Sequence, residues 1–498
     1  MHLSGPFSRL RVTAPSGTAL FRICLLAFAA WAAWLFFQQS RLGIVYPYPL
    51  DYGEGAVLDQ AMRLFGRQTI YRTNFSAPPY VINVYPPVYL AAQIPFLALW
   101  GPAFWYGRLI SVLSALATAL LITATLHEFL RSWERSALAG LTFMVIPYVL
   151  HWAHLFRVDT LALFLSWAGL FVIVRWPKER WSLFAAAGLM VASVYTRQSY
   201  VLAAPLASFC WLWSQNNWKR AATFAALTGS LILGIFVLLN VATGSAFFYN
   251  TITVLNKQTL NMATLWYFVL EVSEHLPILL VAAGGLVITQ IPRANRNGAA
   301  ALILPYLAGS LISALTISKP GSNVNYLLEF AAAISFAAIL LIDWLKRWPW
   351  LHILGLALLA VQIYSLAVWL GTDYYQARLA DPHMENEQIM QLIHQTSGPV
   401  LTDEYIGLLL LDHRPVYIQP FDFTMLAQNG MWDQQPFLDM LDRREFALII
   451  LYDQSTGLLR QRWTKQMLEH IRQNYQQIHP LTTDVDPGGF DEIYVKRP

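Results

Sequence analysis

The sequence predicts a polytopic, mainly α-helical transmembrane bundle that ends in a small soluble α/β domain. Of its 498 residues, 56% are hydrophobic and 12% are charged, whereas a soluble protein carries about 25% charged residues. Long apolar segments recur between residues 20 and 370, and polar character returns after them. The net charge of +4 is scattered between these segments. Because no single basic face forms, a nucleic-acid partner is not expected.

About eleven transmembrane spans are predicted, since a span needs about 20 mainly apolar residues and fewer where a helix is shielded. They cover residues 20–37, 109–126, 137–150, 160–174, 181–195, 200–212, 221–241, 266–288, 299–317, 327–342 and 350–370. The first lacks a convincing small-residue cleavage site, so it is interpreted as a retained span. Residues 86–100 are too short to cross and contain Pro95, which favours a helix at the outer interface.

Basic residues between the spans predict the orientation, because cytoplasmic loops are enriched in Lys and Arg. With the N-terminus inside, every basic loop is cytoplasmic: Arg131, Arg135, Arg175, Lys178, Arg180, Lys219, Arg220, Arg293, Arg296, Lys346 and Arg347. The polar segments then share the outer side. They are the first outer loop at residues 38–107, the loop HWAHLFRVDT, the loop SKPGSNVN and the whole C-terminal part.

Two domains are predicted, a transmembrane domain over residues 1–372 and an extracytoplasmic α/β domain over residues 373–498. In the second, GPVLTDEYIGLLLLDHRPVYIQPF, FALIILYDQ and DEIYVKRP are interpreted as strands. PFLDMLDRRE and LLRQRWTKQMLEHIRQNYQQI have the spacing of amphipathic helices.

Two carboxylates follow the first span in the stretch DYGEG, namely Asp51 and Glu54. One interpretation is structural, because Asp and Glu favour the caps and first turns of helices such as the one predicted at residues 56–65. The other is catalytic: a general base for an acceptor hydroxyl, with the second carboxylate orienting it or holding a metal. The spacing alone leaves both open.

The stretch FRVDT places Arg157 and Asp159 where a loop meets a span, and ionisable residues at that depth are functional candidates by default. The alternative is a local Arg–Asp pair that caps the helix. His151 and His154 precede it on one helical face. They are the candidate metal ligands, although no third ligand is visible.

The stretch SKPGSNVNYLLEF offers hydrogen-bond donors beside an apolar wall, which suits a phosphate. Its candidates are Lys319, Asn323, Asn325, Tyr326 and Glu329. Alternatively, Lys319 extends to the membrane surface and Glu329 pairs with an Arg of another loop.

Three further basic residues fall on the same side: Arg108, Arg197 and Lys257. Arg197, in YTRQSY, is the best phosphate clamp among them, because a guanidinium group can bind phosphate oxygens bidentately. It can equally serve as a structural partner for Asp159 or Glu329.

Motifs of other function classes are missing. The sequence holds no Walker-type phosphate loop, Rossmann fingerprint or Ser nucleophile elbow. A transporter or flippase for lipid-linked sugars would need polar residues through the membrane depth and often shows paired repeats, and neither is visible. That function and a non-catalytic membrane subunit stay as alternatives to an enzyme.

An ordered set of segments resembles a known family. Acidic residues after the first span, then GRQTIYR, then YPPVYLAAQIPFLALWGPAFWYGRLISVLSALATALLI and then FRVDTLALFL are similar to the polytopic glycosyltransferases of the GT-C superfamily. The likeness is to the bacterial branch similar to protein O-mannosyltransferases and aminoarabinose transferases. It covers residues 20–200, and NYLLEF resembles a later outer-loop motif of bacterial relatives.

The resemblance implies an inverting transfer of a hexosyl or pentosyl group from a polyprenyl-phosphate sugar to a hydroxyl acceptor on the non-cytoplasmic face. The acceptor, a glycan, lipid or protein, stays open. A bacterial inner membrane and a role in cell-envelope glycosylation are expected. A divalent cation, Mg²⁺ or Mn²⁺, is the candidate cofactor.

The family also implies roles for particular residues. The base maps onto Glu54 with Asp51 beside it, but relatives carry adjacent Asp-Glu where this chain has Asp-Tyr-Gly-Glu, so the choice stays open. The second acid maps onto Asp159. Tyr85 stands where relatives often carry His or Lys, so Arg157, Arg197 or Lys319 would bind the donor phosphate. The predicted substrate-binding residues are Tyr85, Asn325, Tyr326 and Glu329.

In the C-terminal part, the stretches TDEY, with Asp403 and Glu404, and PFDF are candidates for acceptor binding. Ordinary loop and cap roles are the alternative.

Overall fold

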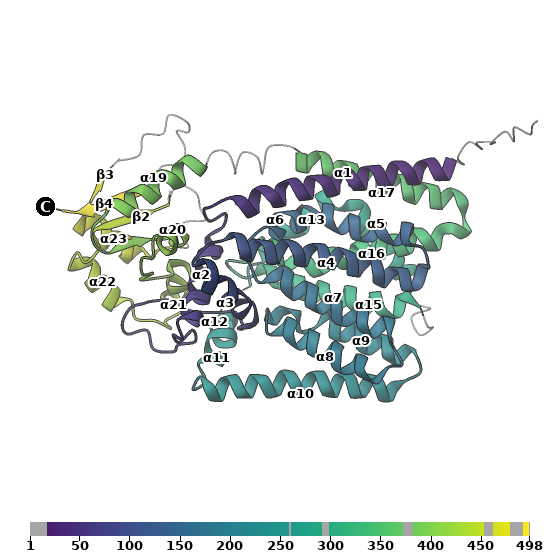
Figure 1. The fold of residues 1–498 in the computed structure, drawn as a ribbon, viewed down its shortest axis with the longest axis horizontal. Coiled ribbons are helices and arrows are strands. Elements are labelled where there is room, and N and C mark those ends of the chain that lie inside the picture. The colour runs from purple at the N-terminus through teal and green to yellow at the C-terminus, as the bar shows by residue number, and fades with distance from the viewer. Residues whose placement is uncertain are drawn as a thin grey trace, which may run out of the picture.

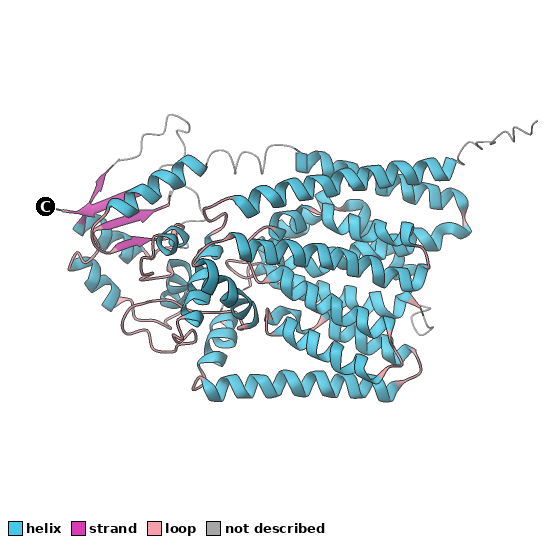
Figure 2. Ribbon diagram, viewed as in Figure 1, coloured by secondary structure: helices cyan, strands magenta, loops and turns pink. Residues whose placement is uncertain are grey.

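The computed structural model describes residues 17–257, 260–290, 298–371, 382–452, 462–478 and 492–497. Long helices run side by side along the longest axis, and a small sheet lies at one end of the molecule (Figure 1). Helices dominate, and the strands are confined to that end (Figure 2). Arg293 and Arg296, two of the predicted cytoplasmic residues, lie outside the described residues, as does the predicted domain boundary at residue 372.

Among the described residues, six helices are long and apolar enough to cross a membrane, or up to eight spans if two bent helix pairs are counted. The chain is thus an integral membrane protein. The bundle consists of α1 (Gly17–Val45), α4 (Trp105–Leu130), α5 (Trp133–Val145), α6 (Pro147–Ala153), α7 (Asp159–Arg175), α8 (Arg180–Val194), α9 (Ala203–Ser214), α10 (Trp218–Ala242), α13 (Met262–His275), α14 (Pro277–Gln290), α15 (Ala299–Ala314), α16 (Leu328–Trp344) and α17 (Pro349–Gly371).

The predicted count of about eleven spans is not confirmed. Helices occupy all of the predicted segments, but α7, α8 and α9 have 17, 15 and 12 residues. At about 1.5 Å per residue, even the longest of these reaches only about 26 Å, short of the ~30 Å hydrocarbon core. Hydrophobicity located the helices, whereas their length decides whether each one crosses.

Two predicted spans are bent. Residues 137–150 correspond to α5 and α6, which meet at 68°, and residues 266–288 correspond to α13 and α14, which meet at 95°. A proline, Pro147 or Pro277, begins the second helix of each pair. Proline fits the first turn of a helix but removes a backbone hydrogen bond inside one, so the chain ends one helix and begins another there.

Short helices cover the end of the bundle that faces the sheet (Figure 1). They are α2 (Tyr52–Phe65), α3 (Val88–Trp100), η1 (Gln198–Val201), α11 (Ala246–Phe248), η2 (Tyr249–Thr253), α12 (Val254–Asn256), η4 (Leu315–Ser318) and η5 (Val324–Leu327). A further short helix, η6 (Leu345–Arg347), joins α16 to α17. The apolar helix α3 has 13 residues, so it falls below the length of a span.

The C-terminal part forms a four-stranded sheet in the order β1-β2-β4-β3. β1 and β2 are parallel, and β4 is antiparallel to both β2 and β3. Its elements are α19 (Pro382–Gln395), β1 (Val400–Thr402), α20 (Ile406–Leu411), α21 (Pro420–Gln428), α22 (Gln435–Asp442), β2 (Leu448–Leu451), α23 (Lys465–Asn474), β3 (Tyr475–Ile478) and β4 (Glu492–Lys496).

Two predictions for this part were wrong in detail. The apolar run after β1 is the helix α20, not a continued strand, and the end of the predicted last helix is the strand β3. A short apolar run fits a buried helix as well as a strand, so periodicity alone does not separate them.

The C-terminal part shares its core with the first outer loop. Phe75, Tyr80 and Ile82 pack among buried residues of α21, α22 and β2. The backbone of Tyr80 pairs with the strand-like segment around Ile418, donating to Tyr417 O at 2.7 Å. The two parts of the chain therefore have one continuous hydrophobic contact between them.

Candidate active site between the bundle and the sheet

Asp51 caps the N-terminus of α2, and its carboxylate is 29% exposed. Its Oδ2 accepts from Gly53 N at 2.9 Å and from an Arg157 Nη at 3.2 Å. A Cβ at position 53 would lie 1.2 Å from an Arg157 Nη atom, so a side chain there would displace the Arg157 guanidinium group. The capping interpretation is thus correct for Asp51, yet part of this carboxylate stays open to a ligand.

Glu54 differs from Asp51 in its burial and in its hydrogen-bond partners. Its side chain is fully buried, and its two oxygens accept four hydrogen bonds from three partners. Arg108 donates from Nε and an Nη at 2.9 and 2.7 Å, and the backbone N–H groups of Leu50 and Phe156 donate at 2.6 Å each. No lone pair directed at a substrate is left over.

Arg108 joins Glu54 to the end of α1. Its guanidinium also donates to three backbone carbonyls, those of Gly43, Tyr46 and Tyr48. A buried bidentate pair with this many additional bonds holds the α1–α2 connection in place. The geometry gives Glu54 a structural environment and leaves Asp51 as the accessible carboxylate of the DYGEG stretch.

Arg157 and Tyr85 lie beside Asp51. Arg157 donates to Tyr85 Oη at 3.4 Å, and its guanidinium carbon lies 5.3 Å from the centroid of the Trp152 ring. The residues of the FRVDT, DYGEG and Pro-Pro stretches thus meet in space, as a shared site requires.

Asp159 lies in a second cluster, although it is only two residues after Arg157 in the chain. Its carboxylate is fully buried and accepts from Trp152 Nε1 and from Asn325 Nδ2, the latter at 3.1 Å. Arg197 forms an ion pair with it. Trp152 contacts both Arg157 and Asp159, so it links the two clusters. Trp152 was not predicted as a site residue, because nothing in the sequence distinguishes it from the other tryptophans among the 19.

Arg197 also lies 4.3 Å from the centroid of the Tyr326 ring. Glu329 is 3% exposed, and its Oε1 accepts no hydrogen bond within the described part of the chain. Because Arg197 is paired with Asp159 and buried, it is held as a structural partner in this arrangement. Asn325, Tyr326 and Glu329 are gathered around that pair.

Lys319 lies at the edge of the site and is only partly buried. Its Nζ approaches Leu255 O at 3.5 Å, and no carboxylate forms an ion pair with it among the described residues. Lys257 lies on the adjoining segment and is exposed. Within the described part of the chain, neither Lys319 nor Lys257 is paired with a carboxylate, so both are available as cations at this edge of the site.

No group of three or more His, Cys, Asp or Glu side chains suited to a metal ion occurs in the described ranges. His154 is 4% exposed and packs against Gly43, where a Cβ would lie 2.7 Å from its ring. The ring centroids of His151 and Trp152 lie 5.7 Å apart. The surroundings of both histidines are those of packed side chains.

The C-terminal part adds charged residues to this end of the site. Arg462 pairs with Glu404 at 2.5 Å, and its guanidinium carbon lies 4.1 Å from the centroid of the Tyr52 ring, next to Asp51 in sequence. Burial raises the pKa of Glu404 to about 7 against the opposing charge of Arg462, and the charge of Asp51 adds to the rise.

Asp422 lies in the first turn of α21. Burial raises its pKa to about 7, although the charges of Arg462 and Arg157 lower it. Asp403, in contrast, is bonded internally to Trp463 Nε1 and to the backbone of Tyr452 and Glu404. Of the TDEY and PFDF candidates, Glu404 interacts electrostatically with Asp51, and Asp422 interacts with Arg157. Asp403 is held by its own hydrogen bonds instead.

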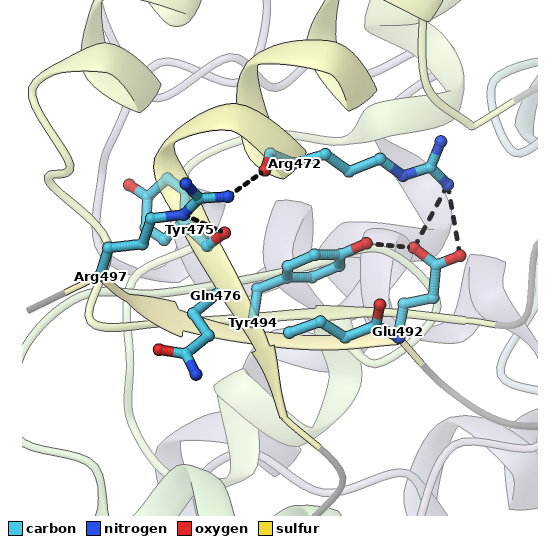
Figure 3. Close-up of a pocket in the computed structure, with 7 residues that line it drawn as sticks. Arg472, Tyr475, Gln476, Glu492, Tyr494 and Arg497 are labelled. Atoms are coloured by element: carbon cyan, nitrogen blue, oxygen red, sulfur yellow. Dashed lines mark hydrogen bonds and ion pairs between the residues drawn. The ribbon is translucent and has the colours of Figure 1, made fainter.

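A separate pocket of about 790 Å³ lies on the β3–β4 side of the sheet (Figure 3). Arg472 contacts Glu492 at 3.3 Å, and Tyr494 Oη donates to the same carboxylate at 2.5 Å. Arg497, which also lines the pocket, donates to the backbone carbonyls of Tyr475 and Arg472. None of the predicted site residues lines it.

No family model and no curated protein sequence matches this chain. Solved structures do match across nearly all of it. ArnT from Cupriavidus metallidurans in the apo state has a TM-score of 0.60 at 14% identity, covering 94% of this chain and 97% of ArnT. The same protein bound to undecaprenyl phosphate has a TM-score of 0.61 at 13% identity, covering 96% and 98%.

The archaeal oligosaccharyltransferase AglB from Archaeoglobus fulgidus, in complex with an inhibitory peptide and a dolichol-phosphate, matches with a TM-score of 0.54 at 9% identity. The alignment covers 95% of this chain and 76% of AglB. The fold is therefore that of the GT-C glycosyltransferases, to which both ArnT and AglB belong. Among them, the aminoarabinose transferase ArnT is similar over its whole length, which confirms the resemblance predicted from the sequence.

Proposed function

We propose that this protein is a GT-C glycosyltransferase that transfers a sugar from a polyprenyl-phosphate donor to a hydroxyl acceptor. The observation that carries the proposal is Asp51, a partly exposed carboxylate fixed by Arg157 and Gly53 at the meeting point of the bundle and the C-terminal part. The donor class is taken from the two similar proteins, whose structures contain undecaprenyl phosphate and dolichol-phosphate.

In this proposal Asp51 is the general base. It removes the proton of the acceptor hydroxyl while that oxygen bonds to the anomeric carbon and the bond from this carbon to the donor phosphate breaks. Attack from the face opposite the leaving group inverts the anomeric centre. Glu54 is not proposed for this role, because its oxygens accept hydrogen bonds from Arg108 and two backbone N–H groups.

The departing polyprenyl phosphate gains negative charge, which cations beside it stabilise. Arg157 and Lys319 are the proposed phosphate-binding residues, with Lys257 as a third. Arg197 is proposed to position other residues and not to bind the phosphate itself, because it pairs with Asp159 and contacts the Tyr326 ring. Tyr85 and Asn325 would orient the donor next to these cations.

The finer parts of the proposal follow from the sequence. The Lys and Arg distribution supports an extracytoplasmic C-terminal part, and the family likeness supports a bacterial inner membrane and the cell envelope. The similar proteins leave both a peptide and a glycan acceptor open, and hexosyl and pentosyl transfer are both compatible with the site.

The test is release of free polyprenyl phosphate by the purified protein, offered a panel of undecaprenyl-phosphate sugars with membrane and cell-wall acceptors. Wild type should release it, and Asp51→Asn should lower the rate at least 100-fold with the protein still folded. Asp433→Asn, an exposed carboxylate on a C-terminal loop, is the matched control and should behave as wild type.

No release from any donor would overturn the proposal. Unchanged donor binding without release would favour a non-catalytic subunit, and movement of intact donor across a vesicle membrane would favour a flippase.

A divalent cation, if one binds, would be held by the exposed oxygen of Asp51 and would supply positive charge for the departing phosphate. In that case chelation stops release and added Mg²⁺ or Mn²⁺ restores it. Equal rates with and without chelator would remove the cation from the proposal.

A further inference from the structure

Side chains from the C-terminal part gather against the start of α2. Arg462 pairs with Glu404 at 2.5 Å and lies 4.1 and 5.1 Å from the ring centroids of Tyr52 and Phe421. The Phe421 ring in turn lies against Gly321 of the SKPGSNVN loop. Residues from three distant parts of the sequence therefore surround one location next to Asp51.

Two polar groups of this set, the Asp422 carboxylate and the Tyr52 hydroxyl, have no hydrogen-bond partner among the described residues. Within the same part of the chain, the Asp422 carboxylate makes no ion pair either, although it is mostly buried. Burial and the negative charge of Asp422 together raise the pKa of the Tyr52 hydroxyl, so the two side chains act on each other. A largely buried polar group without a partner costs free energy, and the donors of a ligand would offset that cost.

The charges select the kind of ligand. Three carboxylates, those of Asp51, Glu404 and Asp422, meet two guanidinium groups, those of Arg157 and Arg462. With all three carboxylates ionised the balance is one negative charge, and the raised pKa values of Glu404 and Asp422, about 7 each, place this state above neutral pH. In that state an anionic group next to Asp422 would be repelled by its carboxylate, whereas neutral hydroxyls can donate to the free carboxylate oxygens.

Aromatic rings complete the set. Tyr52 and Phe421 supply apolar faces next to a carboxylate that only accepts hydrogen bonds, and a sugar ring carries both apolar C–H faces and hydroxyl donors. We propose that Asp422, with Tyr52 and Phe421, binds the hydroxyl groups of a neutral sugar that serves as the acceptor. That the bound sugar is the acceptor rests on the proposed function. Of the possible acceptors, the assignment favours a glycan over an anionic lipid.

The test is direct binding, measured by saturation-transfer NMR on the full chain in lipid nanodiscs. The probes are methyl glucoside, methyl galactoside and methyl mannoside, with methyl glucuronide as the anionic counterpart. At least one neutral probe should bind, Asp422→Asn should weaken that binding at least fivefold, and glucuronide should bind at least fivefold more weakly. Asp433→Asn should match wild type.

Folding of Asp422→Asn is checked by its melting temperature and by its affinity for undecaprenyl phosphate, and Asp422→Ser serves as a second variant. Absence of neutral-probe binding, wild-type binding by both Asp422 variants, or preference for glucuronide would overturn the inference. Polyprenyl-phosphate release measured in the same preparations separates the two ideas. Release without sugar binding contradicts this inference alone, and sugar binding without release contradicts the proposed function alone.

Discussion

At the scale of single residues, the role of a carboxylate depends on which hydrogen-bond donors already bind its oxygens. Asp51 and Glu54 are both acidic and three residues apart, but only Glu54 meets a buried guanidinium. The sequence indicated both residues, because acidic groups beside a span are rare enough to be conspicuous. It did not separate them, since the difference depends on Arg108, 54 residues further along the chain.

Substitutions of the two carboxylates should therefore have different effects on folding and on activity. Glu54→Gln leaves Arg108 without its ionic partner inside the protein, which should cost roughly 3–5 kcal/mol and reduce the yield of folded protein. Asp51→Asn should fold normally and lose polyprenyl-phosphate release. Size-exclusion profiles and melting temperatures of the two variants measure this difference. A well-folded, inactive Glu54→Gln would return the base role to Glu54.

Asp422 should make stability depend on pH. Its pKa is raised to about 7 in the folded protein, so it favours the folded state fully only below its ordinary pKa near 3.8. That contribution is lost as the pH rises and is gone above about pH 7. Asp422→Asn cannot ionise, so its melting temperature should exceed that of wild type by roughly 2–4 °C at pH 8.

The advantage of Asp422→Asn should shrink toward pH 4.5, and Asp433→Asn should show no such trend. Thermal melts across this range provide the comparison. An offset that is constant with pH would show that the Asp422 carboxylate is not held in its neutral form.

At the scale of elements, α2 is placed by its contact with α20. Gly55 and Gly407 meet backbone to backbone, and a Cβ at Gly55 would lie 2.6 Å from Gly407 N. The helices themselves were predictable from apolar length and capping residues. The bends at Pro147 and Pro277 and the helical form of α20 were not, because these depend on how neighbouring elements pack.

Gly55→Ala should separate α2 from α20 and displace Asp51. Backbone atoms cannot yield as a flexible side chain can, so we expect a loss of roughly 1–3 kcal/mol and slower release of polyprenyl phosphate. Gly229→Ala in α10 is the control, because a Cβ there meets nothing within 4 Å. Equal melting temperatures for the two variants would contradict a tight α2–α20 contact.

At the scale of the whole molecule, the sheet is bound to the bundle through shared interior residues. Phe75, Tyr80 and Ile82 belong to the first outer loop but are buried with C-terminal aromatic residues. Trp432 Nε1 also donates to Phe75 O at 3.0 Å. The change in composition near residue 372 predicted a separate domain, and composition carries no record of such distant contacts.

A protease site inserted within residues 372–381 should test this connection. After cleavage, the two fragments should stay together in mild detergent and elute as one species, because the contact between them is hydrophobic. Size-exclusion chromatography followed by gel electrophoresis reads the outcome. Separation of the fragments would restore the picture of an independent C-terminal domain.

The pairing of Ile82 with Gln419 joins residues 337 positions apart. At a synthesis rate of about 5–20 residues per second, the ribosome needs roughly 17–67 s to deliver the second partner after the first. During that interval the aromatic side chains of the first outer loop have no core to enter. A chain that terminates before α21 therefore lacks the C-terminal residues that pack against the first outer loop. Such a chain cannot assemble the site around Asp51.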